Sequence, residues 1–285
     1  MPFPVLSMND PMAAFDVMPL RHQRDLQRLR QQQPYFSGTL AKGFMVLQRL
    51  ASDPRPQANS ELARALGMPR PTVSRLCRSL ALLGLLDHDP SSDRYAIGPA
   101  ALTLGYPYQV NTPWLSSLRP LMQALVTRAQ GAVSLGVVTE GDVVYIETCA
   151  HEGGTLLRPA SGAVHGVLET AMGRAWLASL PEPDLLITLL RLRELRPQEY
   201  ARCAEQVQDS LQHQEERGFA VNFGDAGLGV WALGMASRLR YGPRTLLFNC
   251  AVQGVHWTRT GLMRHLGPSL TQLVEAANRL RRIDS

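Results

Sequence analysis

The stretch NSELARALGMPRPTVSRLCRSLALLGLLDHDPSSDRYAIG, residues 59–98, decides how the first part of the chain folds. Ser60 can cap the start of a short helix, and Glu61 then lies in the first turn, where the helix dipole favours an acidic side chain. Gly67 can take the left-handed conformation that ends a helix. Pro71 suits the first position of a second helix. The stretch therefore predicts two short helices joined by a tight turn.

The second helix and the segment after it complete a recognisable unit. Apolar residues recur along this helix at helical spacing and predict its buried stripe: Val73, Leu76, Leu80 and Leu83. Residues 85–87 and 94–98 are short β-type runs around a Pro/Ser/Asp turn at 89–93, which is typical of a hairpin. Helix, turn, helix and hairpin together predict a winged helix-turn-helix.

A winged helix-turn-helix can bind DNA because the major groove admits one α-helix, whose side chains then contact base edges and phosphates. Hydroxyl and basic side chains fall mostly on the faces that the apolar stripe leaves free. The predicted DNA-binding residues are Ser60, Arg70, Thr72, Ser74, Arg75, Arg78 and Arg94. Arg94 is placed to contact the DNA backbone from the wing. Two alternatives remain: a helical hairpin that binds protein, and an Arg75 that pairs within the domain.

Composition is compatible with a DNA-binding domain joined to a second domain. The chain has 285 residues and a net charge of +5, enough length for two domains. Residues 1–110 contain 12 Lys/Arg against 8 Asp/Glu, whereas the remainder contains 17 against 16. This asymmetry fits a basic DNA-binding part, although a solvated charged surface would look similar.

Neither a secretory signal nor a membrane span is visible in the sequence, so we expect a cytoplasmic protein. Its cysteines are far apart, without metal-ligand spacing, and are expected to be free thiols: Cys77, Cys149, Cys203 and Cys250.

The chain divides into four predicted segments. Residues 1–36 are an N-terminal extension with too few apolar residues to fold alone, and we expect disorder; a short polar helix whose arginines follow DNA is the alternative. Residues 37–106 form the winged helix-turn-helix domain, and 107–115 form a linker. Residues 116–285 form a second domain. A helix before the helix-turn-helix has the predicted buried stripe Leu40, Phe44, Leu47 and Leu50.

The second domain is predicted to be an antiparallel sheet with packed helices, so the fold class is α+β. Strands are expected at residues 132–138, 143–149, 230–237 and 245–252, within a sheet of about five or six strands. Helices are expected at residues 114–130, 170–180, 183–195 and 198–217. A C-terminal helix has the stripe Leu262, Leu266, Leu270, Leu273, Ala277 and Leu280.

Several motifs together resemble the IclR family of bacterial transcription regulators. The first domain matches in LAKGFMVLQRLA, ELARALGMPRPTVSRLCRSLALLGLLDHD and RYAIGPAALTLG. The second matches in VVYIET, ETAMGRAWLASLP, RGFAVNFGDAGLGVWALGM and LLFNCAVQG. The resemblance spans about residues 40–282. It implies an operator-binding winged helix, a GAF-like effector domain, and assembly into homodimers or homotetramers.

The resemblance also implies a pocket for small carboxylates or aromatic acids. Carried over position by position, its residues are Ala171, Met172, Asn222, Ala232, Asn249 and Ala251, with Leu168 and Cys250 close by. Some members have Asp, Cys and Ser where this chain has Asn222, Ala232 and Asn249, which changes the groups that a ligand must present.

The residues themselves also suggest that the ligand of this pocket is an organic acid. The N-terminus of a helix that starts near Thr170 offers free N–H groups for a carboxylate, to which Asn222 and Asn249 could donate. Both asparagines could instead only cap turns or strand ends. Arg158 and Arg174 could pair with an anion or form surface ion pairs.

Signals for an enzyme are weak, and we expect no catalytic residue, metal or cofactor. Gly227–Ala232 matches G-x-G-x-x-A, but a strand-like run follows where a dinucleotide site needs a helix. His151 and Glu152 lack the second histidine of a zinc motif. Cys250 with His256 could be a nucleophile and base, although a buried structural thiol is commoner. The sequence thus predicts a ligand-responsive regulator; the alternatives are an enzyme or sensor whose helix-turn-helix contacts protein, and a constitutive DNA-binding protein.

Overall fold

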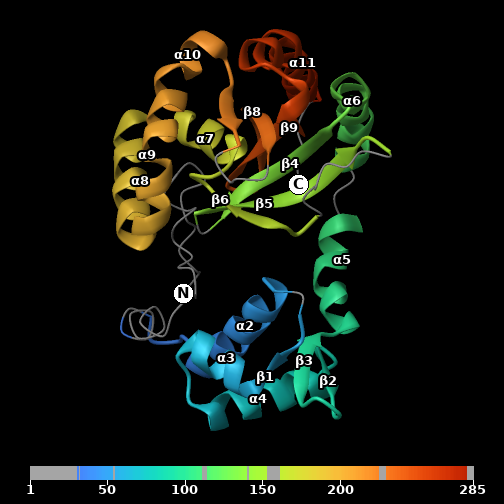
Figure 1. The fold of residues 1–285 in the computed structure, drawn as a ribbon, viewed down its shortest axis with the longest axis vertical. Coiled ribbons are helices and arrows are strands. Elements are labelled where there is room, and N and C mark those ends of the chain that lie inside the picture. The colour runs from blue at the N-terminus through green and yellow to red at the C-terminus, as the bar shows by residue number, and fades with distance from the viewer. Residues whose placement is uncertain are drawn as a thin grey trace, which may run out of the picture. The chain divides into compact units, whose positions relative to one another are not determined.

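The computed structural model describes residues 31, 33–53, 55–110, 114–139, 141–152, 161–224 and 229–280. The chain separates into two compact units, one within Met18–Thr112 and the other containing Pro113–Ser285 (Figure 1). Most of the extension 1–36 lies outside the described residues, so its predicted disorder stays a prediction.

The first unit is a winged helix-turn-helix, as predicted. Its elements are α2 (Gly38–Ala51), β1 (Gln57–Ala58), α3 (Asn59–Leu66), α4 (Arg70–Leu82), β2 (Leu86–Asp89), β3 (Arg94–Ile97), the 3-10 helix η2 (Pro99–Ala101) and α5 (Leu102–Val110). The strands form an antiparallel sheet in the order β1-β3-β2. Strand β1 is only two residues long and was not predicted.

The start of α3 differs from the prediction. Ala58 is the N-cap residue, and its N–H donates to Glu61 Oε2 at 2.8 Å. Ser60 is therefore the second helical residue and not the cap. Gly67 ends α3 with φ 61°, which confirms its predicted role. Pro71 is the second residue of α4, one position later than expected.

The buried face of α2 is rotated from the predicted stripe. Ala41, Met45 and Val46 are buried, whereas Leu40 and Phe44 are 74% and 49% exposed. Of the other two predicted positions, Leu50 is buried and Leu47 is half-buried, so the prediction is wrong only in the first half of the helix, where the face of Ala41 and Met45 packs against α4 and α3.

The predicted stripe of α4 is wrong at its last position. Val73 and Leu80 are buried and Leu76 is half-buried, but Leu83 is 69% exposed. The unpredicted Cys77 completes the buried face of this helix.

Helix α5 continues through Pro107 to Val110, so the predicted linker 107–115 is helical in its first four residues. Residues 111–113 are outside the described part, and α6 begins at Trp114.

The second unit is an antiparallel sheet with helices on both faces, which confirms the α+β class. Its strands are β4 (Ala132–Thr139), β5 (Asp142–Ala150), β6 (Val164–Gly166), β7 (Ala220–Phe223), β8 (Val230–Tyr241) and β9 (Arg244–Gln253). Their order in the sheet is β6-β5-β4-β9-β8-β7. The four longer strands were predicted, whereas the short β6 and β7 were not.

Helices cover both faces of this sheet (Figure 1). They are α6 (Trp114–Ala129), α7 (Ala171–Ala178), α8 (Glu182–Leu195), α9 (Pro197–Gln212), α10 (Gln214–Arg217), the 3-10 helix η3 (Gly254–His256) and α11 (Arg259–Arg279). Helices α6 and α11 share one core with the sheet, and α7, α8 and α9 share another. The predicted helix 198–217 is divided at His213.

The start of α7 lies directly on the sheet. A Cβ atom at Gly234 of β8 would be 2.2 Å from the Ala171 carbonyl oxygen and 2.7 Å from the Met172 nitrogen. Only glycine allows this approach, which brings the first turn of α7 onto the middle of β8.

Candidate functional sites

The outward face of α4 carries basic and hydroxyl side chains. Arg70, Arg75 and Arg78 are exposed, with Thr72 and Ser74 half-buried among them. Because residues four apart are neighbours on a helix, Arg70, Ser74 and Arg78 form one row, and Arg75 lies beside it. None of the three arginines forms an ion pair with a residue that the structure describes. The alternative that Arg75 pairs within the domain therefore finds no partner among these residues.

The opposite face of α4 holds the helix in place. Val73, Cys77 and Leu80 are in the core of the unit together with Met45 and Leu62. Burial raises the pKa of the Cys77 thiol to about 11, so this group is neutral and acts as an apolar side chain. The arginine row is thus presented by a helix whose rotation is fixed by packing.

Arg94 has a different setting from the one predicted. Its Nη1 donates to the Pro56 carbonyl at 2.8 Å and to Glu61 Oε2 at 2.9 Å, and its Nη2 donates to Glu61 Oε1 at 3.2 Å. These bonds, and the N–H of Ala58 above all, lower the pKa of the Glu61 carboxyl. Arg94 thus joins the wing to the start of α3, which gives it partners inside the domain and not only the predicted DNA backbone.

The tip of the wing is acidic. The Asp89 carboxylate accepts from the Ser91 N–H at 2.9 Å and from its hydroxyl at 2.7 Å, as well as from Ser92. These hydrogen bonds lower the pKa of Asp89 to about 2. Asp93 lies at the same turn and pairs with His88 at 3.0 Å. A negative wing tip opposes close approach of a phosphate, which disfavours the tip itself as a contact with the DNA backbone.

The second candidate site is an alanine floor on the sheet face that α7 covers. Strand register places Asn222 beside Ala232, Ala232 beside Ala251, and Ala251 beside Ala132. Ala171 of α7 packs against Ala232 and Ala251, each of which is 8% exposed. The structure therefore brings these predicted effector residues together from four separate segments.

A polar row runs beside the alanine floor on the same face. Asn249 lies between Gly234 and Ser134 in the register, and Ser134 lies beside Thr148. Asn249 Oδ1 accepts from the Ser134 N–H at 3.1 Å, and the Thr148 hydroxyl donates to that of Ser134 at 2.9 Å. Asn249 Nδ2 makes no hydrogen bond to any described residue. Ser134 and Thr148 were not predicted, because only strand register places them beside Asn249.

Asn222 has a structural role. Its Nδ2 donates to the Glu169 carbonyl at 2.5 Å, and its Oδ1 accepts from the Gly224 N–H at 2.9 Å. The side chain thus ties the segment before α7 to the end of β7, as the turn-capping alternative predicted. At the start of α7, Thr170 Oγ1 accepts from the Gly173 N–H at 2.9 Å.

Three other predicted effector residues have fully or almost fully buried side chains. Cys250 is wrong as a lining residue: its side chain is fully buried in the core beneath α6 and α11, on the other face of the sheet, because alternate residues of a strand point to opposite sides. Leu168 and Met172 are 1% and 0% exposed in the core with α8 and α9.

Arg174, one of the two arginines suggested for anion pairing, lies inside the second unit and not on its surface. Arg174 is 1% exposed, and it donates to the carbonyls of Leu168 at 3.1 Å and Val221 at 2.8 Å. It therefore binds backbone inside the unit. Arg158 lies outside the described residues.

The alternative of Cys250 as a catalytic nucleophile is not supported by its surroundings. Burial raises the pKa of the Cys250 thiol to about 12, the opposite of an activated nucleophile. All four cysteines are free and buried, as predicted for the free thiols. The described ranges contain no group of three or more His, Cys, Asp or Glu arranged to hold a metal ion. Among the same residues, no helix has both the length and the apolar character that crossing a membrane requires.

A winged helix-turn-helix with an unpaired basic row, joined to a second unit of sheet and helices, is the organisation of a ligand-responsive transcription regulator. Comparison with known proteins identifies the family. The sequence model of the IclR helix-turn-helix domain matches residues 39–90, and that of the bacterial transcriptional regulator IclR C-terminal domain matches residues 108–246. The chain belongs to the IclR family of transcription regulators.

Relatives agree over most of the chain. The HTH-type transcriptional regulator TsaQ1/TsaQ2 of Comamonas testosteroni is 28% identical over 244 residues, which cover 83% of this chain and 86% of that protein. The Pca regulon regulatory protein of Pseudomonas putida is 28% identical over 187 residues, 61% of this chain and 62% of that protein. The crystal structure of an IclR family transcriptional regulator from Brucella abortus has a TM-score of 0.78 at 28% identity, covering 89% of this chain and 96% of that one.

Proposed function

We propose that α4 is the recognition helix and that its arginine row binds an operator in double-stranded DNA. The observation that carries this proposal is that Arg70, Arg75 and Arg78 are exposed and without ion-pair partners among the described residues, on a helix held from behind by the core. Arginine binds guanine in two places and also binds phosphate, while Thr72 and Ser74 can serve either. Ser60, exposed in the first turn of α3, is a further phosphate contact.

The operator is expected to be roughly palindromic because the protein is expected to bind as a homodimer or homotetramer. Large apolar side chains of the first unit support self-association: Leu40 and Phe44 on α2, and Leu102 and Leu104 on α5, are between 49% and 77% exposed. An exposed apolar surface of this kind is typical of an interface.

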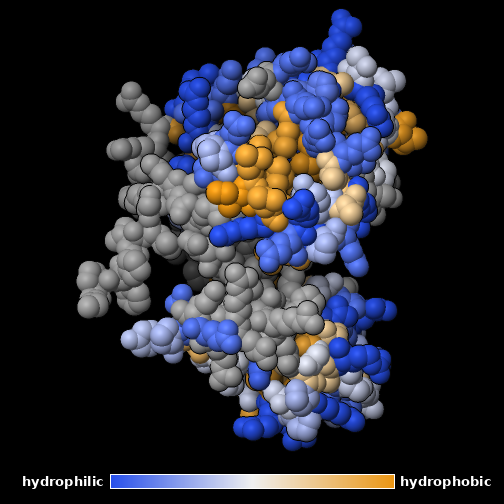
Figure 2. Space-filling model, turned by 90° about the vertical axis from the view of Figure 1, so that its left-hand side faces the viewer, coloured by the Kyte–Doolittle hydropathy of each residue, from blue (hydrophilic) through white to orange (hydrophobic). Residues whose placement is uncertain are grey.

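A second self-association surface lies on α8. Figure 2 shows an apolar patch on the second unit, on the side that carries α8 and α9. Leu186, Ile187 and Leu190 of α8 are 56%, 43% and 55% exposed, at the spacing of one helix face. The first turn of α8 carries Glu182 and Asp184, and its last turn carries Arg193, so two antiparallel copies would bring opposite charges together.

The oligomer can be tested with one substitution. Leu190→Glu should lower the molar mass measured by light scattering after size exclusion, because it places a charge in the apolar surface. Leu195→Glu changes another exposed leucine, at the end of α8, and is the matched control. Equal molar masses for Leu190→Glu and the unmodified protein would show that α8 is not part of the interface.

We infer that the effector is a small organic acid or aromatic compound held over the alanine floor and the polar row. Ala171, Ala232 and Ala251 present small apolar side chains that an apolar body could contact, while Asn249 Nδ2 and the hydroxyls of Ser134 and Thr148 can bind the oxygens of the effector. Binding would favour one state of the second unit and so bias how two DNA-binding units engage their half-sites.

The proposal is tested by selecting genomic DNA fragments with the purified protein at moderate salt, followed by sequencing. An enriched, roughly palindromic site would support it, and the neighbouring genes would narrow the chemistry of the effector. Failure to enrich any site, with and without a library of small acids, would contradict it. We place the protein in the cytoplasm with the DNA it binds, and we assign it no catalytic activity, metal or cofactor.

A further inference from the structure

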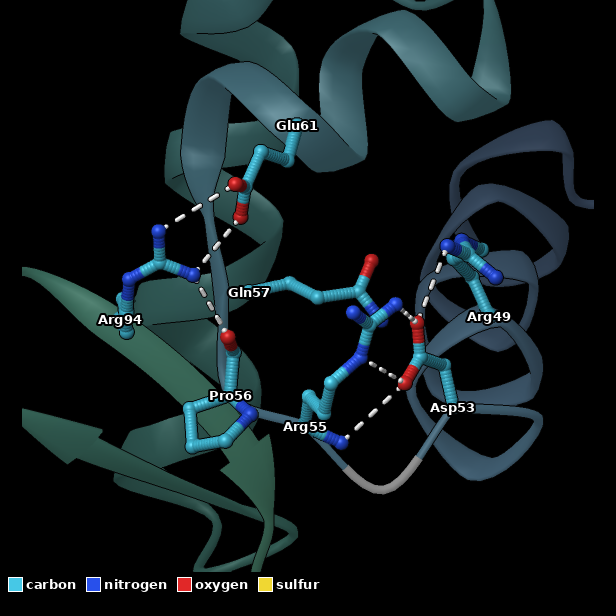
Figure 3. Close-up of a pocket in the computed structure, with 7 residues that line it drawn as sticks. All are labelled: Arg49, Asp53, Arg55, Pro56, Gln57, Glu61 and Arg94. Atoms are coloured by element: carbon cyan, nitrogen blue, oxygen red, sulfur yellow. Dashed lines mark hydrogen bonds and ion pairs between the residues drawn. The ribbon is translucent and has the colours of Figure 1, made fainter.

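A recess in the first unit lies away from the arginine row of α4. It is formed where α2 ends, β1 begins and β3 passes beside the start of α3, and its volume is about 390 Å³. Its lining residues are Arg49, Asp53, Arg55, Pro56, Gln57, Glu61 and Arg94 (Figure 3). The Gln57 side chain extends from β1 into the middle of this recess, between the Arg94–Glu61 pair and the Arg49–Asp53 pair.

The charge of the recess is positive. It contains three guanidinium groups and two carboxylates. Arg55 binds Asp53 through Nε at 3.0 Å and Nη2 at 2.9 Å, and this pairing lowers the pKa of Asp53 to about 2. Arg94 is paired with Glu61. Arg49 Nη2 is 3.6 Å from Asp53, which is already bound in two places by Arg55, so the recess has one positive charge in excess.

Two buried donors of the recess lack partners. Gln57 is 5% exposed, and its Nε2 has no hydrogen-bond partner among the described residues. The Nε of Arg49 is also buried and without a partner there. Buried N–H groups are normally satisfied, and unmet donors beside an excess positive charge suit a ligand that supplies acceptor oxygens and negative charge.

We propose that this recess is a phosphate-binding site with Gln57 and Arg49 as its donors. Because it lies beside the wing and the start of α3, the phosphate is one of the DNA backbone, a source that rests on the function proposed above; free phosphate has the same chemistry. A backbone phosphate held here would position the unit on the duplex without reading its sequence.

The test measures DNA binding of the full chain by fluorescence anisotropy, with an operator and a random duplex. Gln57→Met keeps the size of the side chain and removes the donor. It should weaken binding to both duplexes by the same factor, about 3- to 10-fold. Its melting temperature should not fall, because the lost amide had no partner; a purely structural glutamine would lower it.

Arg49→Gln tests the charge of the site. It should reduce the slope of log affinity against log salt by about one. Arg264→Gln removes the same charge from an exposed position on α11 and should leave the slope unchanged.

A calorimetric titration of inorganic phosphate into the unmodified protein and Gln57→Met distinguishes the two sources. Unchanged DNA binding with phosphate binding lost in the variant would assign the site to free phosphate. No change in either measurement would overturn the site. If the unmodified protein binds no DNA, the proposed function fails, and the phosphate titration alone decides whether the recess binds phosphate.

Discussion

The recognition helix and the effector face differ in how their residues come together. The proposed DNA contacts of α4 all lie between Arg70 and Arg78, on the outward face of one helix. The effector face is assembled from β4, β5, β8, β9 and α7, and two of its hydrogen-bonded residues, Ser134 and Asn249, are 115 positions apart in the chain. A site on one helix can be read from helical periodicity, whereas a site across strands depends on register.

The largest effect on operator binding is predicted for substitutions in α4. If each side chain contacts a base or phosphate, as proposed, Arg75→Ala and Arg78→Ala should each weaken operator binding by about 1–3 kcal/mol, and the double variant by more. Fluorescence anisotropy with a labelled operator measures the change, and Arg264→Ala on α11 controls for loss of one charge. Unchanged affinity in both single variants would show that α4 is not the recognition helix.

A substitution in the effector face should cause a comparable loss of free energy, measured as ligand-induced thermal stabilisation and not as DNA affinity. Ala251→Val fills the alanine floor, so small acids that stabilise the unmodified protein in a thermal-shift screen should no longer do so. At a hundredfold excess over Kd, the lost stabilisation is about 2.7 kcal/mol. Operator affinity without ligand should not change.

Ala201→Val, at an exposed position on α9, is the matched control for the effector face and should retain the ligand shift. A ligand shift that survives Ala251→Val would place the effector elsewhere. Ala251→Val is a sharper probe of the ligand response than substitution of Asn222, another predicted effector residue, by leucine. Asn222→Leu would also break the bonds to Glu169 and Gly224.

The smallest effect is expected at Arg94. Its ion pair with Glu61 is partly exposed and screened by solvent, so Arg94→Ala should lower the free energy of unfolding only slightly. Operator affinity should fall less than in Arg75→Ala, since the guanidinium already has partners. Urea unfolding and anisotropy measure the two quantities, and a loss equal to that of Arg75→Ala would restore the wing as a DNA contact.

Much of the first unit could be predicted because its signals are local. Gly67 ends α3, and the hydroxyl and basic residues of α4 lie outside its core face, as their spacing indicates. The face of α2 could not be predicted, because Leu40 and Phe44 form an apolar row as regular as that of Ala41 and Met45. Only tertiary packing decides which row is buried.

The second unit shows where local signals end. Strands β4, β5, β8 and β9 are long enough to be predicted, but the three residues of β6 and four of β7 are strands only because a neighbour pairs with them. Asn249 and Ala251 point to the α7 side, whereas Cys250 between them points into the other core. The family resemblance matches consecutive positions of a strand. It therefore does not tell which of these residues face α7 and which face the opposite core.

The most direct test of α4 as the recognition helix is a parallel selection of DNA sequences by the unmodified protein and by Arg75→Ala and Arg78→Ala. We predict an enriched, roughly palindromic site for the unmodified protein, and relaxed base preference at symmetric positions in at least one variant. The same site with the same preferences from all three proteins would contradict the account.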